Sequence, residues 1–184
     1  MTPPRARSPE APARGLTQGL QVFLALALAV GAPGCGYTLS SVLPAHIKTI
    51  AIPTFANNTV EHGLADDVTQ ALIDGFLADK KLRLERERDA DSVLRGTVLA
   101  YRNRVYAYDP SEVATQYEIL LIVQVTYRDV VRNRDLWKEN EMVVRTTYHV
   151  VPVGTEPAQT EADGRSDVIQ KLTDLIVSRT IQGW

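Results

Sequence analysis

The clearest regular pattern in the chain is an alternation of apolar and mixed positions between residues 117 and 128. Odd positions are apolar or aromatic, whereas even positions include charged and polar side chains. A period of two places successive side chains on opposite faces of a β-strand. This pattern predicts a strand near 116–131 with one face in the core and a mixed face outside it.

Similar strands are predicted on both sides of this one. Residues 92–109 form a long β-type run in which Gly96 is expected to be a bulge or a point of close packing. After the central strand, residues 132–135 are expected to close a hairpin around Asn133, and residues 136–150 return as its partner. These strands are longer than the usual five or six residues, so they should protrude beyond the helices.

Two segments have the period of an amphipathic helix. From Gly63 to Lys80, apolar residues recur at helical spacing, with acids in the first turn and lysines at the end. A second such pattern runs from about Ser166 to Arg179. A short apolar strand is predicted at 47–55, and a weaker one at 82–88.

The predicted order is β-α-β-β-β-α, with the weak strand at 82–88 as a possible addition. This order favours an α+β fold: a two-layer sandwich with two helices packed on one face of a mixed, roughly four-stranded sheet. The other face of the sheet must then meet water or a partner.

The first 34 residues are predicted to be a signal peptide. Residues 1–15 hold three arginines and one acid, and the uncharged stretch that follows has its apolar centre at Val22–Val30. That centre is shorter than the roughly 20 residues that a transmembrane helix needs. A basic region, a short apolar region and small residues after it are typical of a secretory signal.

Cys35 directly follows this stretch, in Ala32-Pro33-Gly34-Cys35-Gly36. A lone cysteine in this place indicates the cleavage and lipidation site of a bacterial lipoprotein, although Ala32 stands where leucine is usual. An ordinary signal cleavage that leaves a free thiol is the alternative. Gly36 is not the aspartate that retains lipoproteins at the inner membrane, so we expect an outer-membrane anchor on the periplasmic side. Residues 35–46 would form a short tether, and 47–184 the folded domain.

Charge and composition argue against several functions. The formal charge of −2 does not favour nucleic-acid binding, and one cysteine cannot make an internal disulfide or a cysteine-rich metal site. The sequence has no glycine-rich phosphate loop, no G-x-S-x-G and no H-E-x-x-H. The histidines are expected to be structural or solvated, and Asp66, Asp67, Asp89 and Asp91 to cap helices and turns. We therefore predict no enzyme, no metal and no cofactor.

Basic and aromatic residues interleave around the long strands. Arginine recognises phosphate, and tyrosine and tryptophan suit a boundary between apolar and polar surroundings. We expect this positive charge to gather at one end of the strands; a solvated face with ordinary charges is the alternative. The candidate binding residues are Arg102, Arg104, Tyr106, Arg132, Arg134, Trp137 and Lys138.

Several motifs in order resemble one family of lipoproteins. Cys35 is followed by G-Y-x-L, and an I-x-x-I-A-I-P-x-F strand by N-N-T. Further along come A-D-x-V-L-R-G-x-V at Ala90–Val98, Tyr117 and the D-L-W of Asp135-Leu136-Trp137. From Cys35 to Trp184 the chain is similar to the lipopolysaccharide-assembly lipoproteins of the LptE family.

The resemblance implies a non-enzymatic plug and assembly partner inside the LptD β-barrel, which helps deliver lipopolysaccharide to the cell surface. Some family members bind lipopolysaccharide through basic loops at one end. The corresponding loops here, near 109–115 and 154–165, hold only Arg165. The arginines at 102, 104, 132 and 134 are therefore taken from charge geometry as candidates for lipopolysaccharide or partner binding, beside Tyr106, Trp137 and Lys138.

Two other classes remain as alternatives. The N-terminal strand pattern also fits a peptidoglycan-synthase regulator or a curli-type secretion subunit, both outer-membrane lipoproteins. Only 11 residues separate Cys35 from Ile47, which keeps the domain close to the membrane and favours the LptE family. A secreted hydrolase would need a catalytic constellation that the sequence lacks.

Overall fold

The computed structural model describes residues 43–182, which form two helices and a six-stranded mixed sheet. The expected signal peptide, Cys35 and most of the tether lie outside the described residues. The elements follow as β1 (Thr49–Ala51), β2 (Ala56–Asn57), α2 (Leu64–Asp79), β3 (Arg83–Leu84), β4 (Ser92–Tyr108), β5 (Ala114–Asp129), β6 (Arg134–His149) and α3 (Glu161–Gln182).

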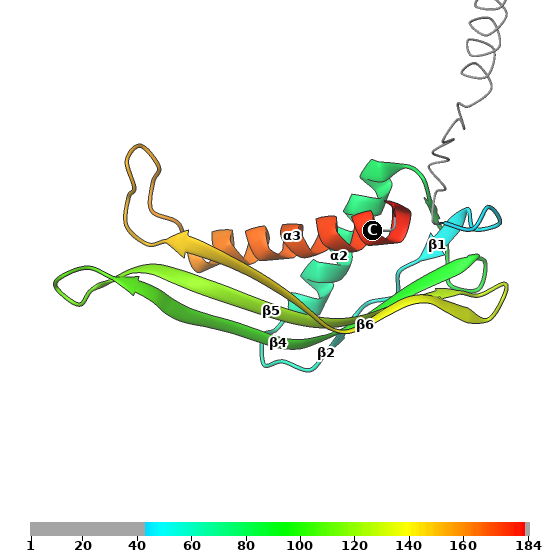
Figure 1. The fold of residues 1–184 in the computed structure, drawn as a ribbon, viewed down its shortest axis with the longest axis horizontal. Helices are drawn as coiled ribbons and strands as arrows, with labels where there is room; N and C mark the ends of the chain where they lie inside the picture. Colours follow the sequence, from blue (N-terminus) through cyan, green and yellow to red (C-terminus); the bar gives the residue numbers. More distant parts are fainter. Residues whose placement is uncertain (1–42, 183–184) are drawn as a thin grey trace, which may run out of the picture. The chain divides into compact units, whose positions relative to one another are not determined.

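Three long antiparallel strands, β4, β5 and β6, make up most of the sheet (Figure 1). Strand β1 lies between β3 and β4 and is parallel to both, and β2 pairs in parallel with β4. The predicted strand at 47–55 is shorter than expected, because Pro53 has no N–H to donate to a ladder. The α+β class is confirmed, but the sheet has six strands instead of four, since β2 and β3 add two-residue pairings.

Helix α2 confirms the helical period predicted for residues 63–80. Its apolar stripe is fully buried, including Leu72 and Phe76. The helix ends where Lys80 adopts a left-handed conformation and donates its backbone N–H to the Phe76 carbonyl at 3.2 Å. The N-cap, Gly63, makes no side-chain hydrogen bond, and the capping role expected of the first-turn acids is not seen.

Helix α3 begins at Glu161, five residues earlier than the sequence pattern predicted. The backbone N–H and the hydroxyl of Thr160 both donate to Asp163 Oδ2 at 2.8 Å, and the Asp163 N–H donates back to the Thr160 hydroxyl at 3.3 Å. This reciprocal cap satisfies N–H groups of the first turn, so the helix can start in a polar stretch. The same bonds hold the pKa of Asp163 below its ordinary value.

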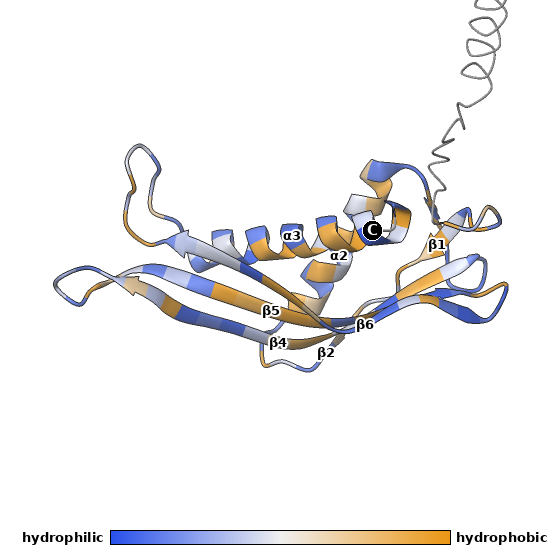
Figure 2. Ribbon diagram, viewed as in Figure 1, coloured by the Kyte–Doolittle hydropathy of each residue, from blue (hydrophilic) through white to orange (hydrophobic). Residues whose placement is uncertain are grey.

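Both helices pack on one face of the sheet. Apolar residues of the helices and the strands meet between the two layers, as the hydropathy colouring shows (Figure 2). On β5 the inward residues Ile119, Leu121, Val123 and Val125 are fully buried, whereas the outward residues between them are half-buried: Leu120, Ile122 and Gln124. The predicted alternation is therefore confirmed, and neither helix covers the other face of the long strands.

Gly96 is a point of close packing on β4. A Cβ atom at this position would lie 2.1 Å from the Phe55 ring, so no larger residue fits without a shift. The first register shift of β4 lies further along, between Val98 and Ala100. Of the two roles expected for Gly96, close packing is the one observed.

Among residues 43–182, neither helix has the length and apolarity that a membrane crossing requires.

Candidate functional site

The candidate site is the outer face of the sheet, meaning the side chains of β4, β5 and β6 that point away from α2 and α3. Strand register arranges this face in rows. Arg102 on β4, Leu120 on β5 and Arg145 on β6 lie directly opposite one another, and Ala100, Ile122 and Val143 form the next row. Val143 is 45% exposed, and both arginines are exposed.

A third row places Arg104 opposite Glu118. The Arg104 guanidinium donates two hydrogen bonds to one oxygen of Glu118, at 2.8 and 2.6 Å. Glu118 is only 7% exposed, so it needs this partner to satisfy a nearly buried carboxylate. Arg104 is therefore largely committed to an internal ion pair.

Bulges decide which cations share the outer face. Arg95 and Arg102 are seven positions apart on β4, as are Lys138 and Arg145 on β6. In a regular strand an odd separation puts side chains on opposite faces. The register shifts at Val98/Ala100 on β4 and between Glu139 and Met142 on β6 each insert one residue, so all four cations lie on one face.

The candidate residues predicted from the sequence do not gather at one end, as expected. Because β4, β5 and β6 run antiparallel, Arg102, Arg104 and Tyr106 lie toward the β4–β5 hairpin. The remaining candidates lie around the β5–β6 hairpin, at the opposite end of the strands: Arg132, Arg134, Trp137 and Lys138. The expectation of a single basic end is wrong for the described residues.

The β4–β5 end is aromatic and apolar. Tyr106 and Tyr108 are 60% and 63% exposed, and Val113 in the same hairpin is also exposed. This hairpin and the neighbouring loop before α3 project beyond the helices (Figure 1). Neither residues 109–115 nor residues 150–160 contain lysine or arginine.

The β5–β6 end is organised around a buried carboxylate. Asp129 is fully buried, accepts a hydrogen bond from the Arg132 backbone N–H at 2.9 Å and lies 2.8 Å from His46 Nε2. Arg134 lies 3.9 Å away. Burial alone would raise the pKa of Asp129, but the hydrogen bonds and neighbouring positive charge outweigh it and lower the pKa. Arg132 therefore takes part in this network through its backbone N–H, and Arg134 through its guanidinium.

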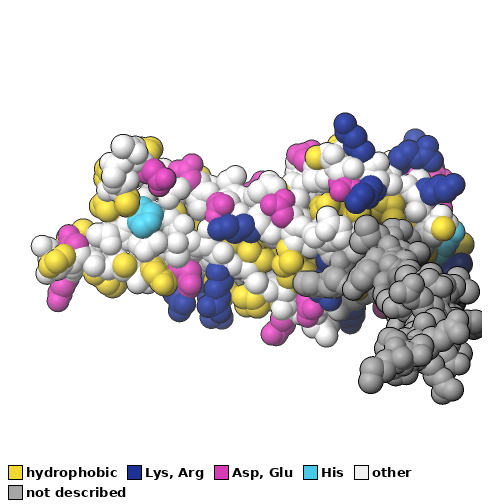
Figure 3. All heavy atoms as spheres, turned by 45° about the horizontal axis from the view of Figure 1, so that its top comes forward, with side chains coloured by type: hydrophobic (Ala, Val, Ile, Leu, Met, Phe, Trp, Pro, Cys, Tyr) yellow, Lys and Arg dark blue, Asp and Glu magenta, His cyan; other side chains and the backbone are white. Residues whose placement is uncertain are grey.

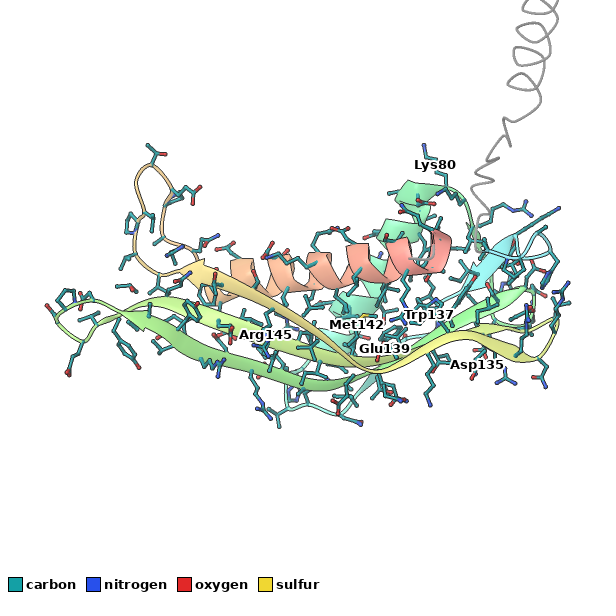
Figure 4. All side chains as sticks on the ribbon, viewed as in Figure 1. Lys80, Asp135, Trp137, Glu139, Met142 and Arg145 are labelled. Atoms are coloured by element: carbon teal, nitrogen blue, oxygen red, sulfur yellow. The ribbon has the colours of Figure 1, made fainter. Side chains whose placement is uncertain are left out.

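Trp137 and Lys138 point to opposite faces of β6. Trp137 packs against the core on the helix side, with its ring 6.2 Å from the Tyr127 ring and 4.9 Å beneath the Arg179 guanidinium (Figure 4). Lys138 lies on the outer face opposite Thr126. Of the two aromatic candidates, only Tyr106 is on the outer face.

Sequence reasoning missed Arg145. In a regular strand, the odd separation between Lys138 and Arg145 would put Arg145 on the helix side. The bulge of β6 between them places it on the outer face. Among the described residues, Arg102 and Arg145 make no ion pair, whereas Arg95 pairs with Glu87 and Arg128 with Asp135. To predict the face of Arg145 one would have to know the bulge of β6, and a single sequence does not reveal a bulge.

A groove with a volume of about 680 Å³ lies between α2 and α3. Three charged residues line it: Asp67 and Arg165, which form an ion pair at 2.7 Å, and Asp74, which accepts a hydrogen bond from Gln70 at 3.0 Å. Within residues 43–182, no three acidic, histidine or cysteine side chains are grouped so as to hold a metal ion. The groove and the outer face can bind, but neither shows a constellation for catalysis.

These features define a two-layer α+β domain whose helices cover one face of the sheet and leave the other open for recognition. The model of the LptE family, described as lipopolysaccharide-assembly, matches residues 47–180, and the chain belongs to that family. A comparison with curated protein sequences finds no match.

Solved structures share the fold at low sequence identity. The protein XCC0632 from Xanthomonas campestris is 10% identical with a TM-score of 0.55, over 75% of this chain and 86% of that one. The protein CT253 from Chlamydia trachomatis is 11% identical with a TM-score of 0.51, over 75% of this chain and 97% of that one. At these identities the likeness concerns the fold alone.

Proposed function

We propose that the protein is a lipid-anchored outer-membrane lipoprotein that acts as plug and assembly partner of an LptD-type β-barrel in lipopolysaccharide transport. Membership of the lipopolysaccharide-assembly family supports this role. A plug must be rigid and must offer a long surface to the barrel wall. The observation that carries the proposal is the open outer face of three strands of 16 or 17 residues.

The anchor in this proposal is an acylated Cys35, exposed after removal of residues 1–34. Each buried CH₂ group of an acyl chain contributes about 0.8 kcal/mol, and two or more chains give durable anchoring. With a tether of 11 residues before Ile47, the domain would stay at the inner surface of the outer membrane. It carries no catalytic step of its own.

The surface candidates divide by their surroundings. Tyr106, Arg102 and Lys138 lie on the outer face and are proposed to contact the barrel or lipopolysaccharide directly. Arg104 would do so only in exchange for Glu118. Arg132, Arg134 and Trp137 are proposed to act indirectly, by holding the β5–β6 hairpin and β6 in place.

Affinity capture tests the proposal. The tagged full-length protein is purified from detergent-solubilised envelopes of its host, and the co-purifying proteins are identified and quantified. Recovery of one large outer-membrane β-barrel in near-equal amount is the expected result. A cell-wall synthase, a ring of the protein itself, or no partner would contradict the barrel role.

A Cys35→Ala variant serves as the control for the anchor. We expect it to lose acylation, detected as the absence of the acyl mass at the N-terminus, and to recover less barrel protein. An unchanged N-terminal mass in this variant would contradict lipidation at Cys35.

A further inference from the structure

We propose that the free edge of β6 pairs with the same edge of a second copy of this chain, across a two-fold axis at Val143. The two β6 strands would run antiparallel, and each would extend the sheet of the other copy. The pairing concerns the protein when no barrel partner is bound. The inference therefore goes beyond the proposed function and does not rest on it.

Strand β6 ends the sheet, because β5 is its neighbour on one side and no strand of the described residues follows on the other (Figure 1). Val150, just after β6, donates its N–H toward β5, to the Thr115 carbonyl at 3.1 Å. The preceding His149 turns to the opposite side, where its carbonyl accepts the Gln159 N–H at 2.7 Å and its N–H donates to the Gln159 side chain at 3.1 Å. The loop before α3 therefore caps this end of the free edge.

The rest of the free edge is open. Pairing with β5 is regular from Met142 to His149, and the bonding direction alternates from one residue to the next. Val143, Arg145 and Thr147 therefore turn their N–H and C=O groups to the free edge, as His149 does. In the part of the chain that the structure describes, these groups have no hydrogen-bond partner. A row of unpaired backbone groups is a template for another strand.

The side chains along this edge are self-complementary. Glu141, Val143 and Arg145 are exposed on the outer face, alternating with the buried Met142 and Val144. With the axis at Val143, each Glu141 lies directly opposite the Arg145 of the other copy, and the two valines face each other. Opposite charges and β-branched residues that lie across from each other stabilise an antiparallel pair.

Other two-fold registers lack this match. An axis at Arg145 would place two guanidinium groups opposite each other, and an axis at Glu141 would do the same with two carboxylates. Like charges directly opposite are destabilising. An axis at Val144 would set Val143 opposite Arg145 and Glu141 opposite Thr147, so no charge would face its counter-charge. Charge complementarity therefore selects the axis at Val143.

Two features keep the pairing short and the dimer weak. The bulge between Glu139 and Met142 interrupts the edge on one side, and Gln159 occupies it on the other. Pairing over residues 141–147 is a small interface, so the dimer should depend on concentration. Long-range repulsion between copies is small, because the formal charge is −2 and Lys and Arg lie among Asp and Glu on the face shown in Figure 3.

Native mass spectrometry of the full-length protein in dodecyl maltoside, over a dilution series, tests the pairing. We expect a dimer in the parent that dissociates on dilution. Glu141→Arg and Arg145→Glu should each weaken it about tenfold, because two attractive contacts become repulsive. The combined change Glu141→Arg/Arg145→Glu should restore the dimer, since each pair then forms with its charges exchanged. Arg95→Glu is the matched control: it reverses a charge on the same outer face, on β4 away from the free edge, and should dimerise as the parent does.

Recovery in the combined variant is the decisive result, because neither a loss of folding nor a change of net charge can produce it. Thermal unfolding of every variant should give the midpoint of the parent, since the altered side chains are exposed. No dimer in the parent, equal losses in Arg95→Glu and Arg145→Glu, or a combined variant as weak as the single ones would overturn the proposal.

Photocrosslinking distinguishes a second copy from another partner. A benzophenone-bearing amino acid replaces Thr147, at the open edge, and envelopes of the host are irradiated. We expect a product of twice the mass of the protein, which Arg145→Glu should reduce. A product with a different protein and none with a second copy would overturn the proposal. The barrel role fails separately: if the parent recovers no barrel while the charge exchange still restores the dimer, only the proposed function fails.

Discussion

The imidazole of His46 lies 2.8 Å from the buried carboxylate of Asp129, which joins the segment before β1 to the turn between β5 and β6 across 83 positions of the chain. Nearby, Asp91 accepts hydrogen bonds from the Lys48 and Thr49 backbone N–H groups at 2.9 and 3.0 Å. These contacts hold the start of the domain to one end of the long strands. The point where a tether enters the fold is therefore fixed by tertiary polar bonds.

Loss of the Asp129 carboxylate is expected to destabilise this end. Asp129→Asn should lower the free energy of unfolding by about 1–3 kcal/mol at pH 7, because His46 and the Arg132 N–H lose a charged acceptor. Urea unfolding measures the change. Asp135→Asn, at an exposed ion pair, is the matched control and should change it by less than about 1 kcal/mol. Equal midpoints for the parent and Asp129→Asn would contradict the role of the network.

The same carboxylate predicts a pH dependence. Hydrogen bonds from Arg132 and His46 outweigh burial and hold the pKa of Asp129 below its ordinary value of 3.8 in the fold. Its stabilising contribution is then complete above that ordinary value and is lost as the pH falls through the lowered pKa. Unfolding curves of the parent and Asp129→Asn should therefore converge in strong acid, and a difference that stays constant would contradict this.

Gly96 is expected to tolerate no side chain. Gly96→Ala should cost about 1–3 kcal/mol of stability, because the new methyl group would meet the Phe55 ring. The double variant with Phe55→Leu should be less destabilised than the sum of the single changes, which a double-mutant cycle by urea unfolding measures. Strict additivity would show that the two residues do not press on each other.

Tyr106 and Trp137 are expected to behave differently. Tyr106→Asp should weaken barrel capture severalfold and change stability by less than about 0.5 kcal/mol, since the ring is exposed. Trp137→Ala should lower stability by about 2–4 kcal/mol, because the ring packs under Arg179 and beside Tyr127. Capture assays and thermal unfolding on both variants separate these effects, and a large stability loss in Tyr106→Asp would place it in the core.

The cap of α3 can be tested at Thr160. Thr160→Ala should cost about 1 kcal/mol and fray the first turn of the helix, whereas Thr160→Ser should retain most of the stability. Hydrogen exchange of the amides near Asp163 would report the fraying directly. Unchanged protection in Thr160→Ala would show that the loop before α3, not the cap, holds this end.

The long strands and α2 were predictable because their patterns are local and strong. Tyr117 to Tyr127 alternate without interruption, so the alternation alone is enough to assign the inward face of β5. Leu64, Val68 and Leu72 recur at helical spacing, and the predicted helix is observed to within one residue at each end. The start of α3 could not be placed, because its first turn is polar and depends on the bonds between Thr160 and Asp163.

The amino-acid sequence was enough to predict the two-layer α+β class, a sheet with helices on one face only, the family motifs and the lack of a recognised catalytic motif. Each of these depends on periodicity or on residues close together in the chain. Which cations share a face of the sheet, in contrast, depends on how the strands pair in the fold. The register shifts at Val98/Ala100 on β4 and between Glu139 and Met142 on β6 each insert one residue into the pairing with β5, and each therefore reverses the side on which later residues lie. Arg102 and Arg145 therefore both lie opposite Leu120 on the outer face. A further register shift, between Asp135 and Trp137, places Trp137 on the core side, and no single strand encodes these pairings.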